Sequence, residues 1–520
     1  MKPITVTEDG QGILVGAPAI ASGTQIPADK AGSSYGQILK STALVGGSSG
    51  ITILLGIVRT KFLAVLLGPS GVGLMGMYNS ITEMATNLAG MGVRNSGVRQ
   101  IAEAAGSGDN LRVARTTKTL RRISLVLGAA GALLLAGLSH PICRLTFQNT
   151  NHGLAVAALS ITVFFAAVSR GQAALIQGLR RLRDLVKISV LGALWGTLLG
   201  IPIIWLGREA GIVPMLVAAS AMTALTSWWY ARRINVVPVR VTWAESAREV
   251  RSLLGLGLAL MACGLMNSVV FYLIRLLVSR QVGLEAVGYY TAAYTLSGIY
   301  VGFILQAMGT DFYPRLTGVA ADNVKCNRLV NEQAEVSLLL AVPGVLFTLT
   351  LAPLVIHIFY SGRFDPAAEV LRWQVLGILG RVASWPMGFI LLAKGNSKVF
   401  FWTEFASSVV HVALLWIGVR LWGVTGAGVA FFGLYIFYCG LMIWVSRRIS
   451  GFRWSPANLR LAAWLFPSVA VVFLSTKSLP PMWAMGTGLA VSVICGVYCL
   501  RSLARKLPRH RLGIFAGFVT

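Results

Sequence analysis

Charged residues are scarce in this sequence. Only 12% of its 520 residues are Asp, Glu, Lys or Arg, about half the share of roughly 25% that a soluble domain carries. Hydrophobic residues make up 55%, and the mean hydropathy is +0.71. Long apolar runs recur from residue 42 onward, and each approaches the ~20 residues that a helix needs to cross a bilayer. A soluble globular protein is therefore excluded, and an all-α polytopic membrane protein is predicted.

Acidic residues are the scarcer charged class, with 18 Asp and Glu against 45 Lys and Arg and a net charge of +27. In a soluble protein such an excess would suggest a nucleic-acid partner. Here the basic residues lie in short loops between apolar runs, as the positive-inside rule describes for membrane proteins. We therefore expect membrane lipids, and no nucleic acid, as partners.

Cysteine is also rare. The six cysteines are scattered, with no CxxC pair and no Cys/His cluster of zinc-site spacing. The sequence contains no phosphate loop of the form GxxxxGK(S/T) and no GxSxG or HExxH motif. We expect no metal, no cofactor, no structural disulfide and no enzymatic activity.

Apolar windows predict twelve membrane spans and a further C-terminal pair. They fall at about 42–67, 72–94, 123–145, 153–179, 186–206, 211–231, 253–279, 285–311, 332–360, 367–393, 398–419, 424–446, 459–476 and 482–500. With the N-terminal tail placed inside, the outside loops hold only six basic residues: Arg144, Arg208, Arg280, Arg363, Arg420 and Lys477. The excess on the other side predicts that both termini are cytoplasmic.

The two halves of the chain carry a repeated pattern. The link between the first two spans reads Gly68-Pro-Ser-Gly-Val-Gly73, and the link between the seventh and eighth reads Gly283-Leu-Glu-Ala-Val-Gly288. Leu175-Ile-Gln-Gly178 and Leu392-Ala-Lys-Gly395 form a second matched pair. A duplicated six-helix unit is predicted, in which the two copies enclose a cavity near the middle of the membrane and rock about it.

This repeat sets the predicted domain organisation. The extra pair lies outside the repeat and has no counterpart in the N-terminal half. We expect a disordered cytoplasmic tail, two six-helix lobes with a cytoplasmic linker between them, the extra pair and a basic cytoplasmic tail, at residues 1–40, 41–234, 235–251, 252–448, 449–501 and 502–520.

Polar residues recur at helical spacing in the second span. Asn79, Glu83 and Asn87 are four residues apart, so they share one stripe of a helix, which we expect to face the bundle interior. Glu83 is a candidate for carrying a coupling proton or cation, because burial raises the pKa of a carboxyl group. The alternative is a plain interhelical ion pair or hydrogen bond.

The seventh span carries a similar stripe that includes Tyr272 and Arg275. A guanidinium offers a planar fork of donors that matches a phosphate, and the pairing strengthens in a low dielectric. Arg275 therefore suits an anionic substrate, or it forms an ion pair with Asp311. Asp311 lies at the inner end of the eighth span and is a candidate gating residue.

Further basic residues fall within predicted spans. Charges in this position usually face a wet cavity or a partner. We expect Lys61 and Arg372 to extend toward an interface. The remaining four come from both halves and are candidates for lining one cationic cavity: Arg59, Arg170, Arg275 and Arg381.

The first span and the later segments also resemble a known family. Leu55-Gly-Ile-Val-Arg59-Thr-Lys61-Phe-Leu-Ala-Val-Leu-Leu-Gly68-Pro-Ser-Gly-Val-Gly-Leu74 resembles the first-span signature of bacterial polysaccharide flippases of the Wzx type. These belong to the multidrug/oligosaccharidyl-lipid/polysaccharide exporter superfamily. Phe271-Tyr-Leu-Ile-Arg275, Phe312-Tyr-Pro-Arg-Leu316 and Trp373-Gln-Val-Leu-Gly377 are similar to later stretches of that family. The likeness covers about residues 40 to 446.

The resemblance implies a V-shaped bundle that moves an undecaprenyl-diphosphate-linked oligosaccharide from the cytoplasmic to the periplasmic leaflet of the bacterial inner membrane, as in O-antigen and lipopolysaccharide biosynthesis. It implies that the sugar and diphosphate enter a cationic cavity while the prenyl tail stays in lipid. A monomer is expected, with a polysaccharide polymerase and chain-length proteins as partners. The alternative function is an ion-coupled multidrug/cation antiporter of the same superfamily, for which acids would dominate the cavity.

Overall fold

The computed structural model describes residues 28–307 and 312–506, and every regular element in those two ranges is a helix. The all-α prediction is confirmed. The N-terminal half contains α1 (Ala28–Gly90), α2 (Val93–Gly106), α3 (Asn110–Gly137), α4 (Ser139–Phe147), α5 (Gly153–Gly178), α6 (Leu182–Leu198), α7 (Gly200–Gly207), the 3-10 turn η1 (Arg208–Gly211) and α8 (Ile212–Arg232). The C-terminal half contains α9 (Trp243–Gln281), α10 (Leu284–Ala307), α11 (Tyr313–Gly318), α12 (Asn323–Thr350), α13 (Ala352–Phe359), η3 (Gly362–Phe364), α14 (Pro366–Ala393), α15 (Ser397–Ser450), α16 (Pro456–Ser478) and α17 (Pro481–Lys506).

Nine helical stretches within the described residues are long and apolar enough to cross a membrane. Three of them, at Gly50–Gly90, Leu182–Arg232 and Ser397–Ser450, contain 41, 51 and 54 residues. Because about 20 residues suffice for one crossing, each of these three is long enough to cross twice. The protein is an integral membrane protein, and the count of fourteen spans stays a prediction, since helix length alone does not locate the bilayer.

The longest helices are broken where the sequence predicts separate spans. In α1 the backbone leaves the helical region at Gly68, with φ 68° and ψ −171°, and Pro69 follows inside the helix. A positive φ of this kind favours glycine, which has no Cβ to clash with the backbone. In α15 the break falls at Trp422 and Gly423. Both breaks coincide with predicted links, at 68–71 and 420–423.

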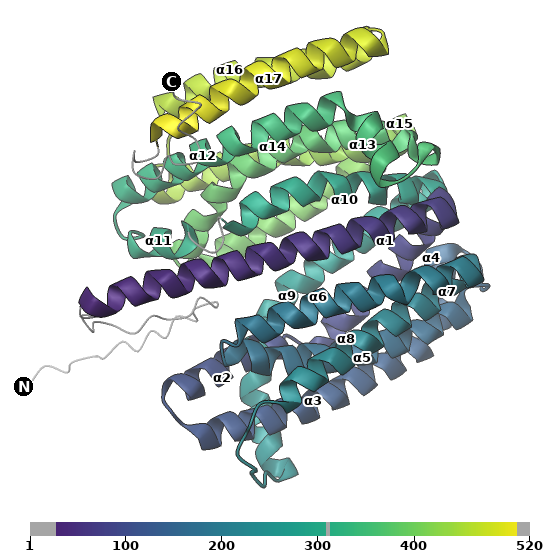
Figure 1. Ribbon diagram of the computed structural model, residues 1–520, viewed down its shortest axis with the longest axis vertical. Coiled ribbons are helices and arrows are strands. Elements are labelled where there is room, and N and C mark those ends of the chain that lie inside the picture. The colour runs from purple at the N-terminus through teal and green to yellow at the C-terminus, as the bar shows by residue number, and fades with distance from the viewer. Residues whose placement is uncertain (1–27, 308–311, 507–520) are drawn as a thin grey trace, which may run out of the picture.

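The helices form two groups with α1 between them (Figure 1). In the N-terminal half α5 packs against α3 and α8, and in the C-terminal half α14 packs against α10, α12 and α15. The helix α1 contacts α3, α5 and α6 of the first group and α9 and α10 of the second. The polar stripe of α1 is therefore positioned where both groups can reach it.

The extra C-terminal pair forms the outermost layer beside α12 (Figure 1). Buried amides anchor it: the side chain of Asn458 in α16 donates to the main-chain and side-chain oxygens of Asn331 in α12, both at 3.0 Å. The same Asn331 accepts from the backbone of Ser455 at 2.8 Å and donates to Arg453 O at 3.0 Å. These bonds fix the start of α16 against the C-terminal group.

The repeated links meet each other in space. A Cβ placed on Gly73 would lie 2.1 Å from the carbonyl oxygen of Leu284, and one on Gly288 would lie 2.0 Å from that of Pro69. In the repeat, Pro69 corresponds to Leu284 and Gly73 to Gly288, so the two contacts are equivalent. We call these two contacts the glycine clasp. They hold the two groups together at the end of the bundle where the links lie.

Three boundaries differ from those expected. The helix α1 begins at Ala28, within the segment expected to be a disordered tail of residues 1–40, and residues 1–27 lie outside the described residues. The helix α9 begins at Trp243, inside the predicted linker, which the side chain of Lys118 ties to α3 through Val239 O at 2.8 Å. Toward the C-terminus, α17 continues to Lys506, five residues into the predicted basic tail.

Candidate functional site

The polar stripe of α1 lies along the part of the helix that follows the kink. Asn79 and Glu83 are exposed on the protein surface, and Asn87 is half-buried. The hydroxyls of Thr82 and Thr86 bond back to carbonyls of their own helix, Tyr78 O at 2.8 Å and Thr82 O at 2.6 Å. Asn79, Glu83 and Asn87 thus remain the members of the stripe that can engage other helices or a ligand.

Asn87 joins the stripe to both groups of helices. Its amide nitrogen donates to Ser268 Oγ of α9 at 2.5 Å, and its oxygen accepts from Arg170 Nη1 of α5 at 2.9 Å. One amide can serve as donor and acceptor at once. Asn87 therefore orients Arg170 and contacts the first helix of the C-terminal group.

Arg275 of α9 reaches across to α1. Its Nη1 donates to Ser80 Oγ at 2.5 Å, while its Nε is buried and has no hydrogen-bond partner among the described residues. The guanidinium lies within electrostatic range of Glu83, and so does that of Arg170. The stripe thus brings cations from both halves around a single carboxylate.

A third arginine continues this arrangement in the C-terminal group. Arg381 of α14 lies over the ring of Trp385, 5.3 Å from its centroid, and is within electrostatic range of Tyr294 of α10. Tyr294 is in turn within electrostatic range of Arg275 and Glu83. The order Arg170, Glu83, Arg275, Tyr294, Arg381 thus runs from one half of the chain to the other, and we call these five residues the cationic row.

Several predicted residues lie away from this row. Arg59 faces α6, where its Nη1 is 3.1 Å from the position of a Cβ on Gly196, and no described contact joins it to the other three arginines. The hydroxyl of Tyr272 is hydrogen-bonded to Thr146 Oγ1 at 2.7 Å. Asp311 lies outside the described residues, so neither its gating role nor its pairing with Arg275 is tested.

Lys61 and Arg372, the two basic residues expected to extend toward an interface, each have a partner in the structure. Lys61 Nζ donates to His357 O at 2.7 Å, a contact between the N-terminal and C-terminal halves. Arg372 pairs with Glu369 at 3.3 Å, and Glu369 also pairs with Lys477 in the last turn of α16. No described contact joins either residue to the cationic row.

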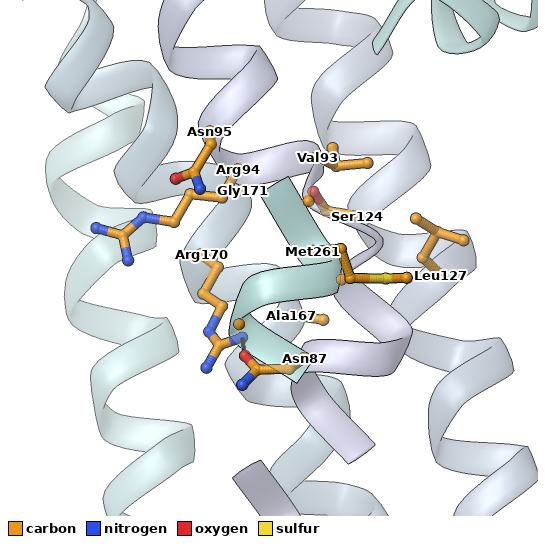
Figure 2. A pocket seen from close by; sticks show the side chains of 13 residues that line it. Asn87, Val93, Arg94, Asn95, Ser124, Leu127, Ala167, Arg170, Gly171 and Met261 are labelled. Carbon is orange, nitrogen blue, oxygen red and sulfur yellow. Dashed lines mark hydrogen bonds between the residues drawn. The ribbon is translucent and has the colours of Figure 1, made fainter. Parts of the chain in front are cut away.

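A pocket of about 220 Å³ adjoins one end of the row. Arg170, Asn87, Arg94 and Asn95 supply its polar wall (Figure 2). Arg94 and Arg170 are within electrostatic range of each other, and their described hydrogen bonds go to neutral amides, Gln177 Oε1 and Asn87 Oδ1. Two neighbouring guanidiniums whose described hydrogen bonds go to neutral amides favour an anion, and the forked donors of arginine fit a phosphate.

Comparisons with known proteins identify the family of this chain. The model of a family described as polysaccharide biosynthesis protein matches residues 62–369. The chain belongs to this family. It is 23% identical over 423 residues to the lipid III flippase of Escherichia coli K12, which covers 79% of this chain and 99% of that protein. It is also 23% identical over 409 residues to a candidate O-antigen transporter of Shigella flexneri, covering 77% of this chain and 95% of the relative.

Solved structures share the fold. An inward-facing multidrug resistance transporter of the MATE family, in the MOP superfamily, has a TM-score of 0.66 at 16% identity and covers 77% of this chain and 95% of its own. The lipid II flippase MurJ in an inward closed conformation has a TM-score of 0.65 at 15% identity and covers 89% and 100%. The polysaccharide exporter family and the transporter fold expected from the sequence are confirmed. The relatives are named as flippases and transporters and not as enzymes, in agreement with the prediction that the chain is not an enzyme.

Three tyrosines near the arginines, and Arg94 in the pocket, were not predicted as site residues from the sequence. Tyr290 and Tyr294 of α10 are stacked with ring centroids 5.9 Å apart, and both lie within electrostatic range of Arg275. Tyr438 donates to Glu404 Oε1 at 2.6 Å near Arg381. Hydroxyls spaced four residues apart in an apolar run were the available signal. Arg94 falls at the end of the predicted span 72–94, where a basic residue is ordinary and gives no signal of a site.

Proposed function

We propose that this protein flips an undecaprenyl-diphosphate-linked oligosaccharide from the cytoplasmic to the periplasmic leaflet of the bacterial inner membrane. The observation that carries the proposal is the cationic row, in which Arg170 and Arg275, one from each half of the chain, lie within electrostatic range of Glu83, and Arg381 joins them through Tyr294. Guanidiniums bind phosphates through paired hydrogen bonds. The row retains an excess of positive charge, which a diphosphate would neutralise.

The named relatives support this substrate class. Those names refer to a flippase of lipid III and a candidate transporter of O-antigen, and the family is described by polysaccharide biosynthesis. For this chain, the proposal assigns roles to four arginines. Arg275 and Arg381 would hold the diphosphate at the cationic row, and Arg94 and Arg170 would receive it at the adjoining pocket. The oligosaccharide would occupy space between the two groups of helices.

The glycine clasp supports an alternating-access cycle. It closes the bundle at the end of the links, whereas the pocket with exposed Arg94 lies beyond Gly90, separated from Gly73 by roughly 25 Å of helix. By the positive-inside rule, the pocket end would face the cytoplasm. On this proposal the structure corresponds to a state that accepts substrate from the cytoplasm, and the clasp opens when the head group leaves.

The antiporter alternative fits the site less well. A cation or cationic drug would need carboxylates free to bind it, and Glu83 lies within range of both Arg170 and Arg275. Each neighbouring guanidinium repels a cationic ligand and competes for the carboxylate. A polysaccharide polymerase and chain-length proteins, acting with a monomer of this protein, remain the expected partners of the flippase.

Deletion of the gene tests the function in cells. Lipid-linked oligosaccharide should then build up on the cytoplasmic leaflet, as measured by its accessibility to added glycosidase in inside-out and right-side-out vesicles. Restoring the wild-type gene should clear it. An unchanged distribution together with increased sensitivity to cationic drugs would reject the flippase and favour the antiporter.

A further inference from the structure

An apolar groove of about 560 Å³ continues directly from the cationic pocket. Leu127 of α3 and Met261 of α9 line both spaces. From these two residues the groove runs between the second part of α1 and α3 and ends near Ile142 of α4. Its volume falls within the roughly 300–1,000 Å³ of ligand sites.

Small residues allow the groove to be deep. A Cβ on Gly131 of α3 would lie 2.3 Å from the Cβ of Ala89 in α1, so the two helices approach closely at this point. Larger apolar side chains stand on either side: Leu88 is 43% exposed and Leu134 is 51% exposed. Two leucine walls over a floor of glycine and alanine make a channel that is shaped for a hydrocarbon chain rather than a flat lipid-facing surface.

Polarity changes abruptly where the two spaces join. The pocket presents Arg94 and Arg170 on one side and Leu127 and Met261 on the other (Figure 2). Beyond Leu127 and Met261 the groove is lined by apolar side chains alone. Lipid-facing helix surfaces are apolar everywhere, but a groove that ends at two guanidiniums matches a molecule with an anionic head and a long apolar tail. An ordinary zwitterionic phospholipid offers less negative charge to this end than a diphosphate does.

We propose that the groove between α1 and α3 holds the head-proximal part of the polyprenyl chain while the diphosphate occupies the pocket with Arg94 and Arg170. This inference rests on the proposed function and changes one expectation drawn from the family resemblance, that the whole prenyl tail stays in lipid. The protein then recognises two parts of its substrate: the pocket binds the charged diphosphate, and the groove binds the start of the hydrocarbon chain. Selection of a polyprenyl diphosphate over a soluble sugar diphosphate follows from this double contact.

Filling the groove tests the proposal. Ala130 lines the groove, whereas its neighbour Ala129 is exposed on α3 and does not. The full-length protein in nanodiscs is titrated with undecaprenyl diphosphate and with methyl diphosphate, which share a head group but differ in that methyl diphosphate has no prenyl chain. Wild-type protein should bind the long-chain probe at least about tenfold more tightly, since a few buried methylenes suffice for that ratio. Ala130→Trp should abolish this preference and leave methyl diphosphate affinity unchanged.

Ala129→Trp is the matched control and should keep the wild-type preference. If Ala130→Trp keeps the full preference for undecaprenyl diphosphate, or if both variants lose that preference equally, the groove proposal is overturned. Arg170→Ala should weaken the two probes by the same factor. If wild-type protein binds both probes equally and Arg170→Ala still weakens them, the groove fails and the flippase proposal stands. If wild-type protein binds neither probe, both fail.

A second measurement needs no variant. Undecaprenyl diphosphate with a diazirine on its first isoprene units is photolysed with wild-type protein, and the labelled peptides are mapped by mass spectrometry. Label is expected in residues 81–91 and 127–142, and excess unlabelled undecaprenyl diphosphate should remove it. Label restricted to α16 and α17, or label displaced equally well by phosphatidylcholine, would show a different chain site or a general lipid site and would overturn the proposal.

Discussion

Gly73 and Gly288 occupy equivalent positions in the two repeats, and each lies against the backbone of the opposite repeat. Neither position has room for a side chain. A Cβ on Gly73 would lie 2.1 Å from the carbonyl oxygen of Leu284, and one on Gly288 would lie 2.0 Å from that of Pro69. Close approach of two helices in a membrane commonly depends on small residues in this way. The duplicated Val-Gly pair thus does more than mark an internal repeat: it lies where each repeat contacts the backbone of the other.

Alanine at Gly73 or Gly288 should force the clasp apart. The obstructing atoms are backbone, so the helices must move, and overpacking of this kind costs about 1–3 kcal/mol. We expect lower transport and greater labelling, by a membrane-impermeant maleimide from outside, of a cysteine introduced at Tyr290. Gly56→Ala and Gly440→Ala are controls, because nothing lies within 4 Å of their Cβ positions. Wild-type labelling of Gly73→Ala would show that the clasp does not close this end.

A disulfide between Gly76 and Thr291, one turn from the glycine clasp, should stop the cycle. A Cβ on Gly76 would lie 3.0 Å from Thr291 Oγ1, a separation compatible with a bridge between two cysteines. The double variant Gly76→Cys, Thr291→Cys should be inactive when oxidised and should regain activity on reduction. Each single cysteine variant serves as a control for crowding near Arg275. Transport by the oxidised, cross-linked protein at the reduced rate would exclude opening of this end.

Glu83→Gln should change binding and transport in opposite directions. Removing the carboxylate leaves Arg170 and Arg275 without a nearby negative charge, so undecaprenyl diphosphate should bind severalfold more tightly. Release should slow, and any dependence of the rate on a proton or cation gradient should disappear. Equilibrium binding and gradient-driven flipping in vesicles measure the two effects. Glu103→Gln, whose native partner is Arg99 at the surface, should change neither.

An unaltered gradient response in Glu83→Gln would count against a coupling role and leave the interhelical interaction as the function of this residue. Weaker substrate binding in the same variant would contradict the view that Glu83 balances the arginines. The two readings that the sequence left open are thereby separated by one substitution.

Asn331→Ala should loosen the C-terminal pair. It removes bonds to Asn458, to the backbone of Ser455 and to Arg453 O, and buried groups left without partners cost about 1–3 kcal/mol each. We expect a lower unfolding temperature in detergent and faster proteolysis between α15 and α16. Gln333→Ala is the control, because in the same helix Gln333 bonds to Ser337 at 3.2 Å in a part-buried setting. Equal behaviour of the two variants would mean that Asn331 is not the anchor.

Helical spacing predicted the α1 stripe well because positions four residues apart always share a face. It also pointed to Arg275, and the Val-Gly repeat indicated where the links lie. The direction of Arg59 could not be derived, because the turn at Gly68 resets the helix face between Arg59 and the stripe. A pattern read on one side of a kink does not transfer to the other.

The remaining parts of the site depend on contacts between distant segments. Tyr294 joins Arg275 to Arg381 only because α10 lies beside both α9 and α14. Asn458 meets Asn331 across 127 positions of sequence. Neither contact has a local periodicity, so neither could be predicted without the packing of the helices.

The most direct test of the account is flipping of undecaprenyl-diphosphate-linked oligosaccharide by purified protein in proteoliposomes. Arg275→Ala and Arg381→Ala should each lower the initial rate about tenfold to a hundredfold, as loss of a charged hydrogen bond of about 1.5–3 kcal/mol requires, while Arg59→Ala tests whether a residue outside the row contributes. Wild-type protein should move the lipid to the opposite leaflet, and Arg275→Lys should retain part of the rate. Wild-type rates in both Arg275→Ala and Arg381→Ala would contradict the central claim that the cationic row carries the diphosphate.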